Sequence, residues 1–320
     1  MRVLVTGIAG FAGPYVGAAL VAAGHDVHGL VRGEGPWPAL ADLPLGRDAF
    51  HRGDLNDARF ADLLSELRPD AIVHLAGLSF VPDAERDPAG AYRTNLDATL
   101  AVLGAVRTRA PKARVLAVTS GDVYGAVTAA DLPLTEDAPL RPLTVYGASK
   151  AAADLAAAQW GRAYALDVVR ARPFNHTGPG QDPDFVCSAL ARQLAMIEAE
   201  QQEPVLRVGN VDPVRDFSDV RDIAAGYVAL LERGRTGEAY NLCSGEGASV
   251  AEVIAMLRGA ARVPVRVQSD PSLRRAHDVP RVIGSHARAT RDTGWMPRMA
   301  LPDTLAAVLE DWRGRLARRA

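Results

Sequence analysis

The sequence predicts an α/β protein in which a doubly wound parallel sheet is followed by a smaller, mixed α/β domain. The first observation is a glycine-rich turn that joins an apolar strand to an apolar helix at the start of the chain. The second is the alternation of strand-like and helical segments up to about residue 172, which is typical of parallel sheets with helices on both faces. The third is the change after Arg172, where helices mix with short strands.

The first unit combines a strand at residues 3–5, a turn at residues 6–13 and a helix that Pro14 opens and Gly24 ends. Proline suits the first helical turn, and glycine suits the position after the last one. Glycines in such a turn let the backbone approach a pyrophosphate, whose charge meets the free amides of the helix N-terminus. The residues expected to contact a dinucleotide here are Gly7, Gly10, Phe11, Ala12 and Gly13.

The second predicted strand, residues 26–32, ends in Arg32, where the adenosine ribose is expected to lie. A carboxylate at this place would bind the 2'-hydroxyl, whereas a guanidinium can bind a 2'-phosphate. Arg32 therefore predicts that NADPH is preferred to NADH; the alternative is a solvent-facing arginine in a loop. Residues 33–44, which are rich in glycine and proline, are predicted to be loop.

Further strands are predicted at residues 49–52, 70–76, 115–119 and 166–171. Asp54 and Leu55 are expected to open the helix after the first of these, and Asp54 either accepts from the adenine amino group or caps that helix. A helix that carries Asn95 follows the strand at residues 70–76. The other residues expected to line the cofactor site are Asp54, Leu55, Leu75, Ala76, Gly77, Asn95 and Pro173.

Tyr146 and Lys150 stand four residues apart at the start of an alanine-rich helix, so their side chains share a face. A tyrosine titrates near ~10 and exchanges protons poorly at neutral pH unless a nearby charge stabilises its anion. Lys150 can supply that charge, and the helix N-terminus acts in the same direction. Taken alone, the pair could also be a coincidence on a surface helix.

The loop predicted at residues 173–180 follows a strand, and open α/β sheets bind ligands at that end of their strands. His176 in this loop is expected to be a packed histidine rather than a base. A helix is predicted at residues 185–200, with short strands at residues 205–208, 238–242 and 265–268. We expect residues 1–172 to form a dinucleotide-binding domain that also receives segments from about residues 211–243. Residues 173–320 are expected to form most of the substrate domain, interleaved with the first.

The composition argues against several classes of protein. The 320 residues are 48% hydrophobic, which supplies a substantial core, and a net charge of -2 favours neither nucleic acid nor an anionic membrane as a partner. No apolar run reaches the ~18 residues of a membrane span, and the chain opens directly on a strand, so a cytoplasmic protein is expected. Cys187 and Cys243 fit no metal spacing and are expected to be buried free thiols, with no metal site. The arginines between residues 313 and 319 are expected on a solvated helical tail.

Three features of the sequence occur together: the pattern Thr6-Gly7-x-x-Gly10-x-x-Gly13, Ser120, and the pair Tyr146 and Lys150. On these residues the chain resembles the extended short-chain dehydrogenase/reductase family over essentially its whole length. The resemblance implies a Rossmann-like sheet. Residues 120–125, 172–181, 215–217 and 240–245 are similar to family members that act on nucleotide-linked sugars, especially reductases of GDP-4-keto-6-deoxy-mannose. The family's usual homodimer would pair helices at residues 91–107 and 149–164 across a two-fold axis, and a higher homo-oligomer is also expected as an option. An alanine-rich helix can instead be buried within the monomer.

The resemblance also implies roles for individual residues. Tyr146 would donate a proton, Ser120 would hydrogen-bond the substrate carbonyl, and Lys150 would hold the nicotinamide ribose while it lowers the pKa of Tyr146. The residues implied on the substrate side are Asp122, Asn175, Arg215, Arg275 and Asp278. Of these, Asn175 and Arg215 would contact the sugar diphosphate, Arg275 a phosphate and Asp278 a ribose hydroxyl. Guanidinium groups match phosphate oxygens in pairs, although each arginine could instead form a surface salt bridge.

Related 4,6-dehydratases carry glutamate where Asp122 stands, and some carry an acid in place of Gly121. This departure favours NADPH-dependent reduction of a C4 ketone, with NADH possible and GDP-rhamnose or its C4 epimer as the product. Asp122 is then either a substrate contact or a structural carboxylate. A dehydratase or epimerase of the same substrates is the second hypothesis, and a cofactor-sensing regulator without chemistry is the third. The nucleotide base and the C4 stereochemistry stay open.

Overall fold

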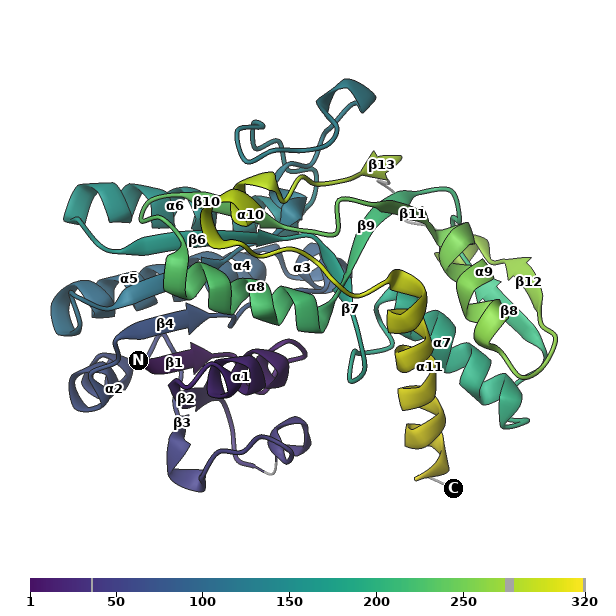
Figure 1. Ribbon diagram of the computed structural model, residues 1–320, viewed down its shortest axis with the longest axis horizontal. Helices are drawn as coiled ribbons and strands as arrows, with labels where there is room; N and C mark the ends of the chain where they lie inside the picture. Colours follow the sequence, from purple (N-terminus) through teal and green to yellow (C-terminus); the bar gives the residue numbers. More distant parts are fainter. Residues whose placement is uncertain (36, 274–278, 319–320) are drawn as a thin grey trace.

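The computed structural model describes residues 1–35, 37–273 and 279–318, and its main element is a seven-stranded parallel sheet (Figure 1). The strand order is β10-β6-β5-β4-β1-β2-β3. The strands are β1 (Arg2–Thr6), β2 (Asp26–Val31), β3 (Phe50–Arg52), β4 (Ala71–His74), β5 (Arg114–Val118), β6 (Val168–Pro173) and β10 (Ala239–Leu242). Because the order reverses between β1 and β4, the sheet is doubly wound, which confirms the predicted fold class.

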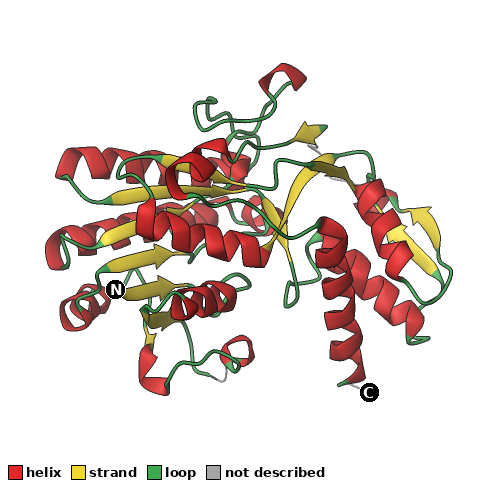
Figure 2. Cartoon of the chain, viewed as in Figure 1, coloured by secondary structure: helices red, strands yellow, loops and turns green. Residues whose placement is uncertain are grey.

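Helices cover both faces of this sheet (Figure 2). The first layer consists of α1 (Gly13–Ala22) and α8 (Val220–Arg233), and the second of α2 (Arg59–Leu67), α5 (Ala98–Arg109) and α6 (Val145–Tyr164). Successive strand residues point to opposite faces, so Val3 and Val5 of β1 pack in the first layer's core and Leu4 in the second. Burial on both faces explains why the central strands are continuous apolar runs rather than alternating ones.

A second group of elements lies beside the large sheet, to the right in Figure 1. One small sheet contains β7 (Asn175–Thr177), β9 (Val214–Asp219), β11 (Gly247–Ser249) and β13 (Arg281–Val282), and a separate pair joins β8 (Val205–Val208) to β12 (Arg266–Ser269). Three helices pack around a core of their own, namely α7 (Val186–Glu198), α9 (Val250–Ala260) and α11 (Leu301–Ala317). By contrast, α10 (Ala287–Thr293) lies against α8 and β10 of the large sheet.

The remaining elements are short and lie in the connections. Between β4 and α5 run α3 (Val81–Arg86), α4 (Pro88–Tyr92) and a π-helical turn, η3 (Arg93–Asp97). The 3₁₀ turns are η1 (Pro38–Leu40), η2 (Arg47–Ala49), η4 (Gly121–Val123), η5 (Ala129–Asp131) and η6 (Pro271–Leu273). The predicted loop at residues 173–180 contains the short strand β7, which pairs with β9.

The structure corrects the predicted start of the helix after β3. Asp54 and Leu55 precede α2, which begins only at Arg59. The Asp54 carboxylate accepts from the backbone N–H of Asn56 at 2.9 Å, the local turn that aspartate favours over helix. Asp54 therefore does not cap α2.

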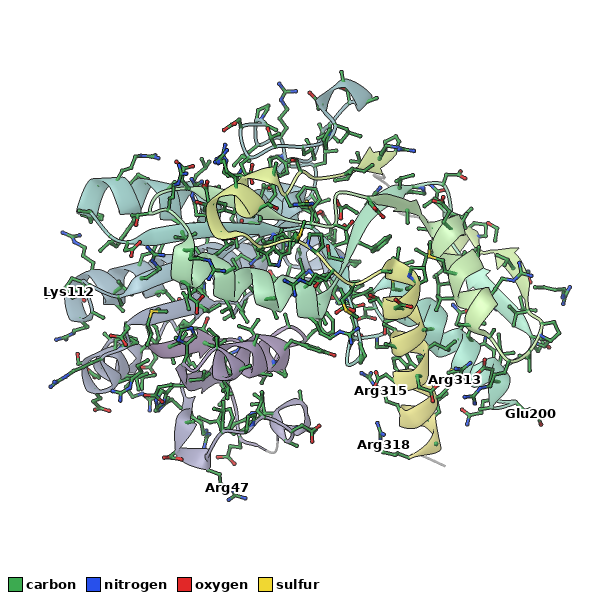
Figure 3. The ribbon with its side chains drawn as sticks, in the orientation of Figure 1. Arg47, Lys112, Glu200, Arg313, Arg315 and Arg318 are labelled. Atoms are coloured by element: carbon green, nitrogen blue, oxygen red, sulfur yellow. The ribbon has the colours of Figure 1, made fainter. Side chains whose placement is uncertain are left out.

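The arginines of α11 are not a solvated tail, contrary to the expectation from the sequence. Arg313 donates from Nε and from one terminal nitrogen to the two carboxylate oxygens of Glu198, at 2.6 and 2.7 Å. This paired contact ties α11 to α7, and Figure 3 shows Arg313 and Arg315 along the same stretch of α11. Arg315 pairs with Asp311 at 2.8 Å and lies over the Trp312 ring. The last residue of the predicted run, Arg319, lies outside the described residues.

The two cysteines, the helix lengths and the clusters of possible metal ligands can be compared with the sequence. Cys187 and Cys243 are buried and free, as predicted. No helix in the described part of the chain is long and apolar enough to cross a membrane, and the cytoplasmic location stays a prediction. No group of three or more His, Cys, Asp or Glu side chains among the described residues is arranged to hold a metal ion.

Candidate active site

A cavity of about 730 Å³ lies at the carboxyl ends of the large sheet's strands, within the usual size range of ligand pockets. Most of the residues predicted for the cofactor line it: Gly7, Gly10, Phe11, Ala12, Gly13, Arg32, Asp54, Leu55, Leu75, Ala76, Gly77, Tyr146, Lys150 and Pro173. Ser120, Asp122 and Asn175 line it as well. Asn95 and Arg215 do not, and Arg275 and Asp278 lie outside the described residues.

The turn between β1 and α1 forms one wall of the cavity. Gly7 has φ +74°, and a Cβ there would lie 2.7 Å from the backbone nitrogen of Ala76. A Cβ on Gly13 would collide with the carbonyl of Ile8. Phe11 and Ala12 line the cavity, and their backbone N–H groups have no acceptor among the described residues. This arrangement fits a pyrophosphate, because free amides and the positive end of α1 both favour an anion.

Arg32 follows β2 and lines the cavity on the other side of β1 from β5, the strand that precedes Ser120. Its side chain is exposed and forms no ion pair with any residue that the structure describes. Arg52 and Arg59 share a small hollow with Arg32 beside the main cavity, but Arg59 pairs with Asp57 at 2.7 Å and Arg52 with Glu34 at 3.4 Å. Arg32 is thus the guanidinium of this group that is available to an anion.

The first turn of α6 is fixed by hydrogen bonds to its exposed backbone N–H groups. Thr144 caps the helix by accepting from the N–H of Gly147 at 3.0 Å, and Glu85 accepts from the N–H of Val145 at 2.8 Å. An N-cap threonine of this kind stabilises a helix by about 1 kcal/mol. These contacts set where Tyr146, the second residue of α6, enters the cavity.

Lys150 is buried, with 7% of its surface exposed, and its ammonium donates to the Val118 carbonyl at 3.3 Å. Burial lowers the pKa of Lys150 to about 8. A Cβ on Gly77, three residues after β4, would lie 2.9 Å from the lysine nitrogen, so this glycine leaves room for the lysine head group. Any side chain at residue 77 would therefore displace the Lys150 ammonium from this position.

Asn95 was predicted to contact the cofactor, but its side chain is engaged in other contacts. Its side-chain oxygen accepts from the N–H of Leu78 at 2.9 Å, and its amide nitrogen donates to the Ser149 hydroxyl at 2.8 Å. The residue is buried in the π-helical turn η3 and is not among the residues that line the cavity. It joins the chain after β4 to α6, so its contacts hold Gly77 and Lys150 in place.

Tyr146 carries a proton that is hard to remove. Burial raises its pKa, the nearby Asp122 carboxylate raises it further, and a hydrogen bond with Ser120 opposes both. The lowering by Lys150 that we expected from the sequence is not met. A phenol that keeps its proton at neutral pH suits a proton donor.

Ser120 and Asp122 follow β5 directly. The Ser120 hydroxyl caps η4 by accepting from the N–H of Asp122 at 3.1 Å, so the serine oxygen lies beside Tyr146 while the carboxylate two residues on faces the cavity. A Cβ on Gly121 would lie 3.0 Å from the Phe174 ring. An acidic side chain at residue 121, as in some dehydratases, would require that ring to move.

A buried charge network that the sequence did not predict lies beneath these groups. Asp154, one turn after Lys150 on α6, is fully buried and accepts from Arg170 at 2.6 Å and from Arg172 at 2.8 and 2.9 Å. It also accepts from the Thr119 hydroxyl at 3.1 Å. These bonds tie α6 to the ends of β5 and β6, the three elements that carry Lys150, Ser120 and the loop at residue 173. The only sequence signal was Arg172 at the head of the motif at residues 172–181.

The substrate side of the cavity is built by β7 and its neighbours. Asn175 is exposed and lines the cavity. The His176 ring stacks on Phe11 with centroids 6.0 Å apart, and its Nδ1 lies 3.0 Å from the Phe174 carbonyl. Burial lowers the pKa of His176, so it is a neutral, packed histidine, as expected.

Arg215 lies on β9, outside the cavity wall. Its guanidinium donates to the carbonyls of Val279 at 2.7 Å and Val214 at 2.9 Å. Val282 of β13, which pairs with Arg215, lines the cavity instead. Arg215 therefore lies on the strand next to one that lines the cavity, and it does not line the cavity itself.

Several residues that line the cavity were not predicted from the sequence. Some follow strands and could have been inferred from position alone: Gly53, Leu78, Ser79 and Thr119. Others come from segments distant in sequence: Arg93, Gln181, Phe185 and Tyr227. Tyr227 belongs to the apolar face of α8, where periodicity predicts only a core residue.

Known proteins match this geometry over nearly the whole chain. A family model described as GDP-mannose 4,6 dehydratase matches residues 4–308. The GDP-6-deoxy-D-mannose reductase of Pseudomonas aeruginosa is 41% identical over 98% of this chain and 98% of its own length. A UDP-glucose 4-epimerase of Mycolicibacterium smegmatis is 30% identical over 98% of this chain and 99% of its own length.

A solved structure agrees with these matches. The structure of RMD from Pseudomonas aeruginosa complexed with NADPH has a TM-score of 0.84 and 39% identity, and the match covers 98% of each chain. The glycine turn, Ser120, Tyr146 and Lys150 therefore occur in a chain whose relatives are reductases, dehydratases and epimerases of nucleotide sugars. The chain belongs to the GDP-mannose 4,6-dehydratase family of proteins.

Proposed function

We propose that this protein is an NADPH-dependent reductase of a nucleoside-diphosphate 4-keto-6-deoxy sugar, with GDP-4-keto-6-deoxy-mannose as substrate and GDP-rhamnose or its C4 epimer as product. The observation that carries the proposal is that Ser120, Tyr146 and Lys150 line one cavity together with Arg32, whose strand β2 lies on the other side of β1 from β5. The 41% identity with a GDP-6-deoxy-D-mannose reductase over nearly full length supports this choice among the family's reactions.

The residues present fit a dinucleotide phosphate. Phe11 and Ala12 would direct their backbone N–H groups at the pyrophosphate, Arg32 would pair with the 2'-phosphate, and Lys150 would hold the nicotinamide ribose. The cofactor, when bound, supplies hydride to the sugar C4. In this assignment residues 1–172, with segments from about residues 211–243, form the cofactor domain, and residues 173–320 form most of the substrate domain.

The protein's own groups would act on the ketone oxygen. Negative charge develops there as the carbonyl is reduced, so donors placed at that oxygen lower the barrier. Tyr146 would give its proton to this oxygen, and Ser120, which hydrogen-bonds Tyr146, would donate a second hydrogen bond. Lys150 would remain charged below its pKa of about 8 and hold the nicotinamide ribose beside these donors.

The two residues after Ser120 favour reduction over dehydration. Removal of a proton next to the ketone needs a base that reaches the sugar ring, and Asp122 is one methylene shorter than glutamate. Gly121 supplies no acid, and the Phe174 ring occupies the space into which one would extend. Dehydratase or epimerase activity therefore remains the second hypothesis.

The decisive assay offers the protein GDP-4-keto-6-deoxy-mannose and NADPH and follows both. We expect one NADPH oxidised for each sugar reduced. Dehydration of GDP-mannose without net consumption of NADPH would instead support the second hypothesis and promote Asp122 to a base. Binding of NADPH with no turnover of any nucleotide sugar would support a regulator.

Cofactor choice should depend on Arg32. We expect Arg32→Ala to raise the KM for NADPH about 10-fold or more, because a hydrogen-bonded charge pair is lost, and to leave the KM for NADH nearly unchanged. Arg47→Ala is the matched control, since Arg47 is an exposed arginine that lines neither hollow. Equal losses with both cofactors would remove Arg32 from the 2'-phosphate site.

A homodimer through α5 and α6 is the second part of the proposal. The outer face of α6 exposes Leu155, with 59% of its surface accessible, beside partly exposed Ala152 and Ala156. Small residues let helices pack closely, and an exposed leucine gains from burial. We expect Leu155→Asp to convert a dimer to a monomer in sedimentation equilibrium, whereas Met296→Asp, at an exposed methionine elsewhere, should not. A wild-type monomer would exclude this interface.

A further inference from the structure

Three tyrosines are among the largest fully buried side chains, and they differ in how their hydroxyls are satisfied. Tyr124 donates to Asn241 at 2.6 Å and accepts from Arg172 at 3.0 Å. Tyr240 accepts from the N–H of Arg235 at 2.9 Å and donates to Asp292 at 3.0 Å. Tyr227 has no hydrogen-bond partner among the residues that the structure describes. Buried phenols usually find a partner, so this exception calls for one.

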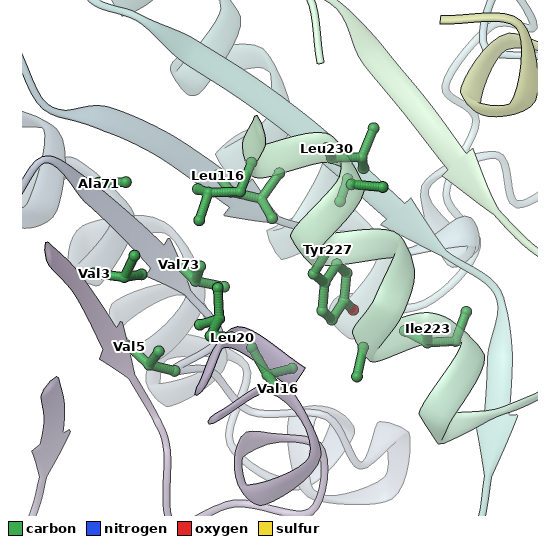
Figure 4. Close-up of a cluster of buried hydrophobic side chains, with 14 of the residues drawn as sticks. Val3, Val5, Val16, Leu20, Ala71, Val73, Leu116, Ile223, Tyr227 and Leu230 are labelled. Carbon is green, nitrogen blue, oxygen red and sulfur yellow. The ribbon is translucent and has the colours of Figure 1, made fainter. Parts of the chain in front are cut away.

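Tyr227 reaches the cavity from within the core. Its ring belongs to the apolar cluster between α8, α1 and the sheet, near Val16 and Leu20, with only 1% of its surface exposed (Figure 4). It also lines the cavity. The side-chain atoms that are both fully enclosed and unpartnered in the described chain are Arg170 Nε and Ser218 Oγ. The Tyr227 hydroxyl also lacks a partner among the described residues, but it is not fully enclosed by protein atoms. Its accessible surface therefore faces the open space of the cavity that Tyr227 lines.

The position of α8 decides which part of the cavity this hydroxyl faces. The helix crosses β4, β5 and β6, whereas Arg32 follows β2, on the other side of β1 in the sheet order. Ser120 follows β5, and Tyr146 is close enough to Tyr227 to contribute to raising its pKa, after the larger effect of burial. The Tyr227 phenol therefore lies at the reaction end of the cavity and stays protonated at neutral pH.

We propose that the Tyr227 hydroxyl hydrogen-bonds the carboxamide of the nicotinamide ring and thereby sets how deeply the ring enters the cavity. The inference rests on the proposed function. A carboxamide offers both an acceptor oxygen and a donor nitrogen, and a neutral phenol can serve either. The adenosine half, at the Arg32 end, would not contact Tyr227.

The test is Tyr227→Phe, which removes only the hydroxyl. We expect the Kd for NADPH and the Kd for NADH each to rise about 3- to 10-fold, the usual effect of one neutral hydrogen bond. The Kd for 2'-phospho-ADP-ribose, which lacks the nicotinamide, should not change. Binding is measured by calorimetry, so the readout does not depend on turnover.

Tyr240→Phe is the matched control, because it removes the hydroxyl of another buried tyrosine, one that does not line the cavity. It should leave all three Kd values unchanged. Unaltered NADPH binding in Tyr227→Phe would overturn the inference, and so would an equal loss for 2'-phospho-ADP-ribose, which would place the hydroxyl at another group. A wild-type protein that binds no NADPH would instead overturn the proposed function.

Discussion

Replacing Tyr146 by phenylalanine should lower kcat by roughly 10²- to 10⁴-fold, the usual cost of losing a general acid. The ring is retained in a site where 7% of its surface is exposed, so the fold and the Kd for NADPH should survive. Stopped-flow or steady-state turnover of GDP-4-keto-6-deoxy-mannose measures the loss.

The control for this change is Tyr164→Phe, at an exposed tyrosine near the end of the same helix. It should turn over normally. If Tyr146→Phe keeps near-normal kcat, the proton comes from another group, and Ser120 or a water that it holds would be the next candidate.

Lys150→Met should separate stability from activity. NADPH should bind more weakly and activity should fall, because the ammonium proposed to hold the nicotinamide ribose is gone. The folded protein, however, should gain about 1 to 3 kcal/mol near neutral pH, since burial of this ammonium lowers its pKa from 10.5 to about 8 and methionine carries no charge to desolvate.

The pH dependence of stability provides a second readout for Lys150. Between about pH 8 and 10.5 the unfolded lysine still binds a proton that the folded one has lost, so this residue makes the wild-type protein more stable as pH rises through that window. Lys150→Met should lack this contribution, and thermal unfolding across the window measures it. A variant that is less stable than wild type at neutral pH would show that the bond to Val118 outweighs the cost of burial.

The large sheet could be predicted because its determinants are local. Gly7 and Gly13 each sit where a Cβ would meet backbone atoms, and the apolar runs that form the strands are buried on both faces. The edge strand β10 was placed as a short strand, but its pairing with β6 depends on contacts far apart in the sequence. The start of α2 was wrong because the side-chain bond of Asp54 to Asn56 outcompeted helix.

The site was predictable where one short motif carries both position and chemistry, as for Tyr146 and Lys150. Roles that depend on tertiary packing were not. Asn95 is drawn into bonds with Leu78 and Ser149, and the pKa of Tyr146 is set mainly by burial, which spacing along a helix does not reveal. The sequence predicts Tyr227 only as a core residue of α8. Its place in the cavity depends on how α8 packs across the sheet, which the sequence pattern does not reveal.

Transfer of deuterium from the cofactor to the sugar is the most direct measurement of the proposed reaction. The protein is given NADPH in which both hydrogens at C4 of the nicotinamide are deuterium, together with GDP-4-keto-6-deoxy-mannose, and the product is analysed by NMR and mass spectrometry. We expect one deuterium at C4 of the sugar in every product molecule, with one NADPH oxidised for each. Product without deuterium at C4, or conversion of GDP-mannose with no NADPH consumed, would contradict a reductase in which Tyr146 protonates the C4 oxygen.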